Sequence, residues 1–90
     1  MDQPIRESGP HLAELLAPAL SGDGPLYRLL ADALKRAVDR GEVPLGTVLP
    51  PERSLARSLS VSRATVVSAY DQLKAQGWLV SRRGSGTWVR

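Results

Sequence analysis

Ninety residues with a formal net charge of +3 and no cysteine exclude several classes of protein. A chain of this length forms one small domain that buries about 60% of its unfolded surface, which leaves no room for a deep cleft between lobes. The absence of thiols excludes disulfides, cysteine nucleophiles and thiolate metal sites. No apolar run approaches the roughly 20 residues of a membrane helix, and no secretory signal is visible, so we expect a cytoplasmic protein that meets no membrane.

The charges are distributed unevenly along the chain. Residues 1–24 carry a net charge of −3, whereas residues 25–90 hold eleven Lys and Arg against five acids. Such an asymmetry indicates a polyanion-binding surface in the C-terminal part. Small soluble domains are often a few charges from neutral, so the positions of individual arginines matter more than the sum.

Residues 1–24 are predicted to form an N-terminal extension with one short helix and a linker. Residues 1–9 show no periodic pattern and look loose. Residues 11–17 predict two helical turns with a leucine face, which packs on the main domain or on something absent from this chain. Pro18 limits that helix because its ring clashes with the preceding turn.

The main domain, residues 25–90, is predicted to begin with a helix over about 25–40. Pro25 suits its first turn, and Gly41 suits the position just past its end. Apolar residues hold the 3.6-residue period over the whole length. This face consists of Leu26, Leu29, Leu30, Ala33, Leu34, Ala37 and Val38. We interpret the element as a scaffold helix.

Two further helices follow, separated by a tight turn. After one short strand at 47–49, Pro51 presets the backbone for a helix over 51–59. Only two residues separate it from the next helix, over 62–76, whose apolar residues recur at i, i+3, i+4 and i+7. This arrangement is a helix-turn-helix.

The helix over 62–76 projects its first turn away from the core. Ser62 is a good N-cap residue, while Arg63, Ala64 and Val67 lie off the apolar face. A helix that buries its later turns and presents an arginine from its first is how recognition helices enter the DNA major groove. Gly77 ends the helix in a left-handed cap.

The last residues predict a β-hairpin. Residues 78–82 and 87–89 read as short strands, and the glycines between them permit a tight turn. Residues 84–86 do not form a phosphate loop, since a third glycine is missing and the segment joins two strands. The predicted fold is mainly α with a small hairpin: a winged helix-turn-helix of three helices and a two- or three-stranded wing, plus the extra short N-terminal helix.

These motifs, taken together, closely resemble the DNA-binding domain of GntR-family bacterial transcription regulators. The resemblance covers about residues 25–90. The motifs that carry it are Pro25-Leu26-Tyr27, the loop 41–46, Leu49 to Ala56, Val61 to Val66, Leu73 to Gly77 and Arg83 to Thr87. The run Ala69-Tyr70-Asp71-Gln72-Leu73 and the arginines and glycines of the wing look most like the MocR subfamily.

Members of that subfamily join this domain to a C-terminal domain that resembles fold-type I aminotransferases and binds pyridoxal 5′-phosphate. The 90 residues contain no such domain. The resemblance therefore implies that the chain is the N-terminal module of a longer regulator, with no cofactor of its own. His11 is the single histidine and has no fixed partner for catalysis or metal binding, so we expect no enzyme activity.

The resemblance assigns DNA contacts to matching positions at the start of the second helix, the start of the recognition helix and the wing tip. Many relatives have Thr or Asn where this chain has Ala64, and many outside the MocR branch have Arg in place of Val67. Both apolar side chains are able to read a thymine methyl but not to hydrogen-bond a base edge. The full predicted set is Arg53, Arg57, Ser62, Arg63, Ala64, Thr65, Val67, Arg82, Arg83 and Gly84.

Several of these residues have alternative roles. Arg63 either reads a guanine or contacts a phosphate without sequence information. Thr65 is a cap-box partner or a phosphate contact, and Arg57 contacts phosphate or is simply solvated. Alternation along the strand turns one of two adjacent arginines inward, which favours Arg83 over Arg82.

The predicted function is sequence-specific binding of double-stranded operator DNA, with helix 62–76 in the major groove and wing 82–87 at the minor groove. Tight binding is expected to require a homodimer on repeated half-sites, or one formed through the absent C-terminal domain. The rival interpretations are a protein-interaction module and a single-strand or RNA binder that stacks bases on exposed aromatic residues. The latter is disfavoured because Tyr70 lies on the apolar face. Operator sequence, effector and the sign of regulation are not encoded in any motif.

Overall fold

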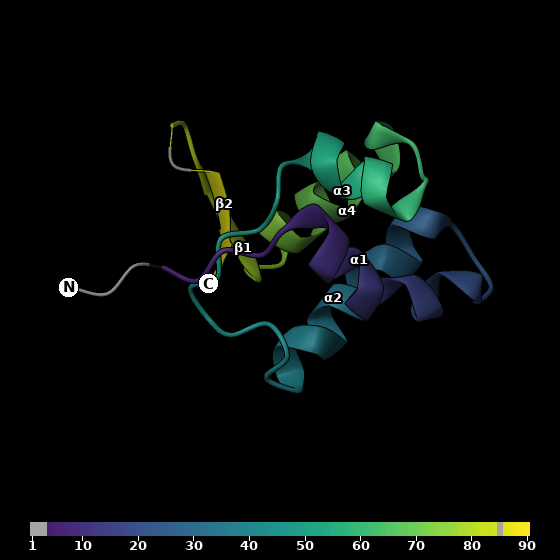
Figure 1. Ribbon diagram of the computed structural model, residues 1–90, viewed down its shortest axis with the longest axis horizontal. Helices are drawn as coiled ribbons and strands as arrows, with labels where there is room; N and C mark the ends of the chain where they lie inside the picture. The colour runs from purple at the N-terminus through teal and green to yellow at the C-terminus, as the bar shows by residue number, and fades with distance from the viewer. Residues whose placement is uncertain (1–3, 85) are drawn as a thin grey trace.

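The computed structural model describes residues 4–84 and 86–90 of the chain. Four helices form one body, and a two-stranded antiparallel hairpin projects from its side (Figure 1). The elements are α1 (Gly9–Leu16), a 3-10 turn η1 (Ala17–Ser21), α2 (Leu26–Asp39), α3 (Glu52–Leu59), α4 (Arg63–Ala75), β1 (Leu79–Arg82) and β2 (Gly86–Val89). The predicted winged helix-turn-helix with an extra N-terminal helix is confirmed.

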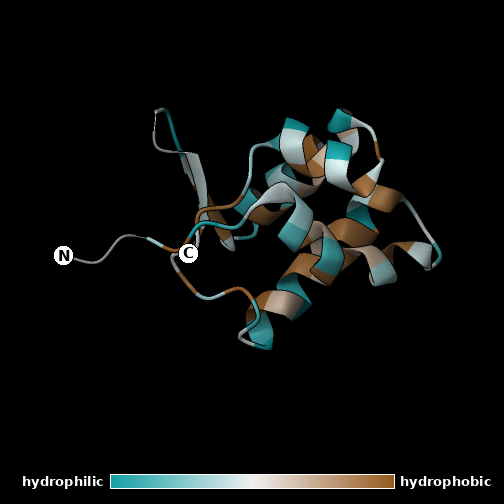
Figure 2. Cartoon of the chain, viewed as in Figure 1, coloured by the Kyte–Doolittle hydropathy of each residue, from teal (hydrophilic) through white to brown (hydrophobic). Residues whose placement is uncertain are grey.

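All four helices contribute to one hydrophobic core. Leu12 and Leu16 of α1, Leu55 of α3 and Val66 of α4 are completely buried in it. The hydrophobic segments of the helices face the interior of the body, whereas the tip of the hairpin is hydrophilic (Figure 2). None of the helices in the described residues is long and apolar enough to cross a membrane.

The buried stripe of α2 is wider than its sequence period predicts. Leu30 and Leu34 are buried as expected, but Leu26 at the helix start is 41% exposed. Ala31, outside the predicted face, is fully buried. The reason is that α2 packs against α4 on one side and against α1 and η1 on another.

The expectation that residues 1–9 are loose is wrong for the part that the structure describes. Arg6 pairs in parallel with Val48, with the Glu7 amide donating to the Val48 carbonyl at 2.9 Å and the Val48 amide to the Ile5 carbonyl at 2.7 Å. Val48 also pairs antiparallel with Trp88 of β2. The predicted strand at 47–49 is therefore a one-residue bridge, and the N-terminal segment lies along the outer edge of the wing sheet.

Helix α1 begins earlier than predicted and packs on the main domain. The Ser8 hydroxyl caps it by accepting from the His11 amide at 3.2 Å. Gly9 lies so close to α3 that a Cβ there would stand 2.6 Å from the Ser54 Oγ. Helix α1 packs on α3. It ends at Leu16, before Pro18, as predicted, and Pro18 lies in the 3-10 turn η1.

Candidate nucleic-acid interface

The first turn of α4 is both fixed and exposed. The Ser62 hydroxyl accepts from the Thr65 amide at 3.1 Å, and its oxygen lies 2.8 Å from the Thr65 Oγ1. These bonds confirm Ser62 as the N-cap and Thr65 as its partner, which satisfies a backbone donor that the helix leaves free. Arg63 and Ala64 are exposed, while Val67 is half-buried at the edge of the core.

The turn between α3 and α4 is made without glycine. Ser60 adopts a left-handed conformation, with φ of 58°, and is the one non-glycine residue with positive φ in the described part of the chain. The amide of Val61 donates to Ala56 at 3.0 Å and that of Ser60 to Arg57 at 3.2 Å, the paired bonds of a Schellman motif. Gly77 ends α4 with the same pattern of bonds, to Leu73 and Lys74.

Tyr70 connects α4 to the start of α3. Its side chain is 1% exposed, and its hydroxyl donates to the Pro50 carbonyl at 2.8 Å. Burial, and to a lesser extent the charge of Glu52, raises the pKa of Tyr70 well above its ordinary value. The hydroxyl therefore stays protonated as a donor, and it joins the middle of α4 to the backbone just before α3.

Both arginines of α3 in the predicted set are exposed. Pro51 precedes the helix with no side-chain cap, and Glu52 supplies the acidic residue of the first turn. Arg53 follows at a position where a cation opposes the helix dipole, and Arg57 lies one turn later. No salt bridge in the described residues involves either side chain.

The wing presents its basic residues at the far end of the hairpin. Leu79 pairs with Val89, and the register runs to Arg82 opposite Gly86. Gly84 and Gly86 have φ of 83° and 90°, which an L side chain adopts only with strain. Ser85, part of the predicted loop, lies outside the described residues. Arg82, Arg83 and Gly84 are all exposed, so strand alternation buries neither arginine.

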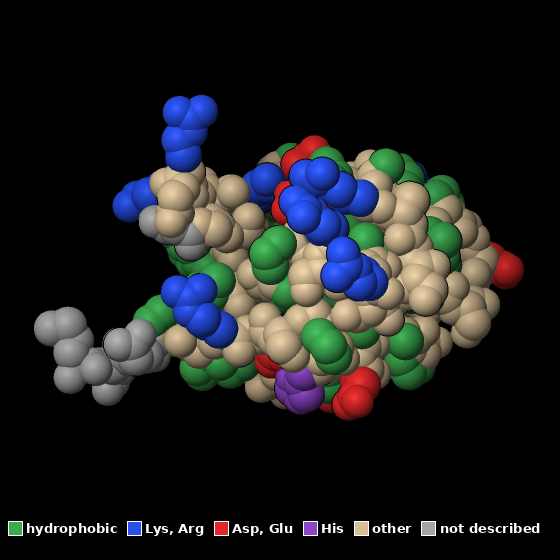
Figure 3. Space-filling model, turned by 45° about the horizontal axis from the view of Figure 1, so that its top comes forward, with side chains coloured by type: hydrophobic (Ala, Val, Ile, Leu, Met, Phe, Trp, Pro, Cys, Tyr) green, Lys and Arg blue, Asp and Glu red, His purple; other side chains and the backbone are tan. Residues whose placement is uncertain are grey.

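Three of the predicted arginines line one groove. Arg53 and Arg57 come from α3 and Arg63 from the start of α4, and the same groove is also lined by Glu52, Pro51 and Pro10. On the face shown in Figure 3, basic side chains gather near the middle of the body and at the projecting hairpin, and some acidic side chains border the central basic cluster. The helix-turn-helix therefore brings together residues that are ten positions apart in the sequence.

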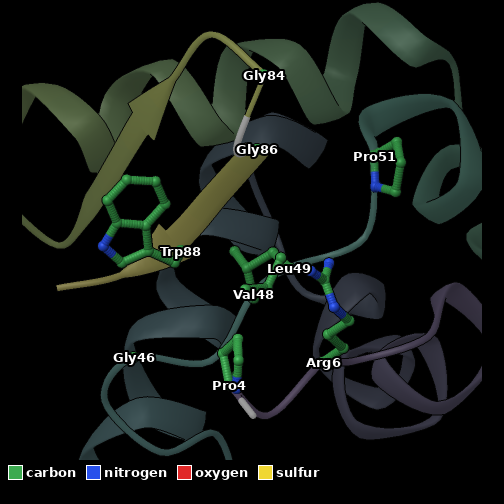
Figure 4. A pocket seen from close by; sticks show the side chains of 9 residues that line it. All are labelled: Pro4, Arg6, Gly46, Val48, Leu49, Pro51, Gly84, Gly86 and Trp88. Carbon is green, nitrogen blue, oxygen red and sulfur yellow. The ribbon is translucent and has the colours of Figure 1, made fainter.

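A second groove adjoins the first, since Pro51 lines both. The wing glycines Gly84 and Gly86 line it on one side and the N-terminal segment, including Arg6, on the other (Figure 4). Arg82 and Arg83 do not line either groove. Sequence reasoning missed Arg6 because a single basic residue in a segment without periodicity carries no signal of its neighbours.

Trp78, Tyr27 and His11 make contacts within the domain. Trp78 and Tyr27 are half-buried against the core, and the guanidinium of Arg28 lies 5.9 Å from the centre of the Tyr27 ring. The His11 Nδ1 hydrogen-bonds Glu7, and this bond raises the pKa of His11. Among the described residues, no three His, Asp or Glu side chains gather as metal ligands would.

A helix-turn-helix followed by a hairpin, with arginines exposed on both, defines a winged helix-turn-helix of the kind found in DNA-binding regulators. The sequence also identifies the family of this winged helix-turn-helix. Residues 26–89 match the family model described as bacterial regulatory proteins, gntR family, and the chain belongs to this family.

Relatives and solved structures agree with this assignment. The probable rhizopine catabolism regulatory protein MocR of Rhizobium meliloti is 48% identical over 67 residues, 74% of this chain but 14% of MocR. YtrA from Sulfolobus acidocaldarius, a GntR-family transcription factor, is 30% identical with a TM-score of 0.77, covering 84% of this chain and 80% of that one. The AraR DNA-binding domain in complex with operator ORX1 is 29% identical with a TM-score of 0.70, covering 76% of this chain and 82% of that one.

These comparisons confirm the predicted GntR membership and the likeness to a MocR regulator. The comparisons also show how much of such a relative this chain matches. The chain spans about one seventh of the length of MocR. The match therefore covers the DNA-binding part of such a regulator and not its remaining length.

Proposed function

We propose that this chain binds double-stranded operator DNA as the DNA-binding module of a bacterial transcription regulator. The observation that carries the proposal is the groove in which Arg53, Arg57 and Arg63 converge from two helices. No acid in the described residues forms a salt bridge with any of the three. Three exposed cations on one rigid surface suit a polyanion, and the exposed helix start between them suits a major groove about 12 Å wide.

The first turn of α4 supplies the base contacts in this proposal. Arg63 is the one side chain of that turn with several strong hydrogen-bond donors, and bidentate contact with guanine O6 and N7 is worth about 1–3 kcal/mol of discrimination. Ala64 is exposed and available to a thymine methyl. Val67 is half-buried, so it offers only its outer methyl to a base.

The remaining residues of the predicted set position the duplex. Ser62 and Thr65 hydrogen-bond each other, and their hydroxyls retain the capacity to bond a phosphate oxygen. Arg53 and Arg57 contact phosphates on one side of the major groove, which sets register without reading sequence. At the wing, Arg83 and Gly84 approach the minor groove, where the negative potential favours arginine.

A salt titration tests DNA binding as such. If about four arginines each displace a counterion, the logarithm of the association constant falls with the logarithm of salt concentration with a slope of about −4. For a protein-interaction module, the association constant with duplex DNA would depend only weakly on salt concentration. Duplex DNA would also not compete with its protein partner. Preferential binding of single-stranded DNA over duplex would contradict the proposal in favour of base stacking.

A homodimer on repeated half-sites is the second part of the proposal. One module offers few base contacts, and two copies on half-sites about one helical turn apart double them. Affinities for duplexes with one and two copies of a selected half-site test this. Equal affinities would exclude a dimeric site for the isolated module.

The wider regulator is proposed by analogy. A module of this kind works in the bacterial cytoplasm, where operators are, and needs neither catalysis nor a cofactor to bind them. We propose that pyridoxal 5′-phosphate, as in MocR-subfamily regulators, would bind to a C-terminal domain outside these 90 residues. Adding it to the isolated module should then leave DNA affinity unchanged.

A further inference from the structure

We propose that the N-terminal segment Pro4–Glu7 is a DNA-contacting arm, and that Arg6 binds a backbone phosphate of the same duplex. This inference rests on the proposed function and adds a contact from outside the matched family region, which begins at residue 26. It concerns the groove between the wing and the start of α3 (Figure 4).

The arm is held in place by backbone and side-chain bonds. Two hydrogen bonds of 2.7 and 2.9 Å join it to Val48 on the edge of the wing sheet. At the end of the arm Glu7 bonds to His11, and the next residue, Ser8, caps α1. Gly9 then packs against α3 with no space for a Cβ. The arm is thus attached through Val48 to the wing sheet, and α1, which follows it, packs on α3.

The arm aims Arg6 into the groove. Successive side chains of an extended segment point to opposite sides, so Arg6 points away from Glu7, whose side chain is 8% exposed. The Arg6 side chain extends toward Leu49 and Pro51 in Figure 4. Arg6 is exposed, and no salt bridge in the described residues involves it.

The neighbouring groove determines what Arg6 meets. Gly84 lines the Arg6 groove, and Arg53 and Arg63 line the adjoining one, with Pro51 between the two. Because Pro51 lines both grooves, we expect a duplex that contacts both Gly84 and Arg63 to pass close to the groove that Arg6 lines. In such a complex, the phosphate backbone of the duplex would lie near the Arg6 guanidinium. A guanidinium is able to bind a phosphate through two parallel hydrogen bonds.

The test measures duplex binding by Arg6→Gln against wild type, with Arg36→Gln as the matched control. Arg36 is exposed on α2 in a separate groove lined by Leu15 and Pro18 of the N-terminal extension, so it loses the same charge away from the interface. The loss of one phosphate contact predicts about an eightfold weaker association at 0.1 M salt and a salt slope smaller by about 0.9. Arg6→Lys should retain most of the affinity.

The outcomes separate the two proposals. If wild type binds duplex DNA and Arg6→Gln behaves as Arg36→Gln does, the arm proposal is wrong while the proposed function stands. If wild type itself shows no salt-dependent duplex binding, both are wrong. A changed preference between A·T and G·C sites in Arg6→Gln would show base reading in the minor groove and would overturn the phosphate assignment.

Discussion

The recognition helix and the wing present arginines to the same face but are held by different forces. The helix α4 buries Val66, Ala69, Tyr70 and Leu73 in the common core, and a side-chain cap fixes its first turn. The wing strands have four residues each, and among the described residues of the hairpin only Leu79 and Val89 are buried. The wing is positioned mainly by backbone hydrogen bonds to the segments around Val48.

We infer from this difference that α4 and the wing have different roles in DNA recognition. Base-edge hydrogen bonds demand a side chain held in a defined position, and a helix locked into the core supplies it. Groove width varies with DNA sequence, and a hairpin with little buried surface adjusts to it by local opening. We therefore expect substitutions on the buried face of α4 to change global stability, and substitutions at the wing turn to change DNA affinity with little effect on stability.

The largest expected effect is the loss of core packing beneath α4. Leu73→Ala removes a side chain that is 1% exposed and should cost about 2–5 kcal/mol in the free energy of unfolding. The matched substitution in the wing, Val80→Ala, loses a half-buried cross-strand contact with Trp88 and should cost about 1 kcal/mol or less. Urea denaturation followed by circular dichroism measures both. Equal costs would show that the wing is as much part of the core as α4.

A smaller effect is expected from two glycines with the same backbone conformation. Gly77 and Gly84 both have φ of 83°, and a Cβ on either would meet nothing within 4 Å, so any cost is conformational. Gly77→Ala strains the end of α4 and should lower global stability by about 1–2 kcal/mol. Gly84→Ala should leave the urea midpoint near wild type, since the wing turn opens locally, but should weaken DNA binding. Identical midpoint shifts in the two variants would contradict this separation.

Ser60 offers the opposite substitution. It holds a left-handed conformation at the turn of the helix-turn-helix, and a non-glycine residue there costs about 1–2 kcal/mol. Ser60→Gly relieves that cost but increases the entropy of the unfolded chain by about 0.4–1 kcal/mol. We expect a net gain in stability of between zero and about 1.6 kcal/mol, the difference between these ranges, measured by the same urea denaturation. A loss of stability would show that the Ser60 side chain contributes a contact of its own.

The smallest expected effect is a pH dependence of the N-terminal arm. Because the bond to Glu7 raises the pKa of His11 in the folded state, the pair stabilises the arm fully below the ordinary His pKa of about 6.5. This stabilisation is lost as the pH rises through the higher folded value. Hydrogen exchange of the Val48 amide, corrected for intrinsic rates, should report stronger protection at acidic than at alkaline pH. In His11→Gln the protection should not vary with pH, and the same variation there would contradict the assignment.

Local signals in the sequence predicted most of the fold. The period of the apolar residues located α2, α3 and α4 to within about two residues, because each of these helices has one face toward the core. Ser62 and Gly77 marked the ends of the recognition helix, and both cap it as predicted. The membership of the gntR family followed from the same residues in their order.

Non-local contacts were not predictable in this way. The pairing of Arg6 with Val48 joins single residues far apart in the chain. A bridge of one residue is too short to produce the alternation of apolar and polar side chains that predicts a strand. The exposure of Leu26 and the burial of Ala31 depend on where α1 and η1 pack, which the period of α2 alone does not contain. The DNA contacts of the arginines and the wing stay predictions, although the structure brings three of those arginines into one groove.

The central claim is that the first turn of α4 reads bases through Arg63. Selection of binding sites from random duplex DNA, carried out with wild type, Arg63→Ala and the control Arg36→Ala, tests it most directly. We expect wild type and the control to select one common motif, and Arg63→Ala to lose preference at a guanine by about 1–3 kcal/mol. If Arg63→Ala selects the same motif with unchanged affinity, the base-reading role of Arg63 is wrong.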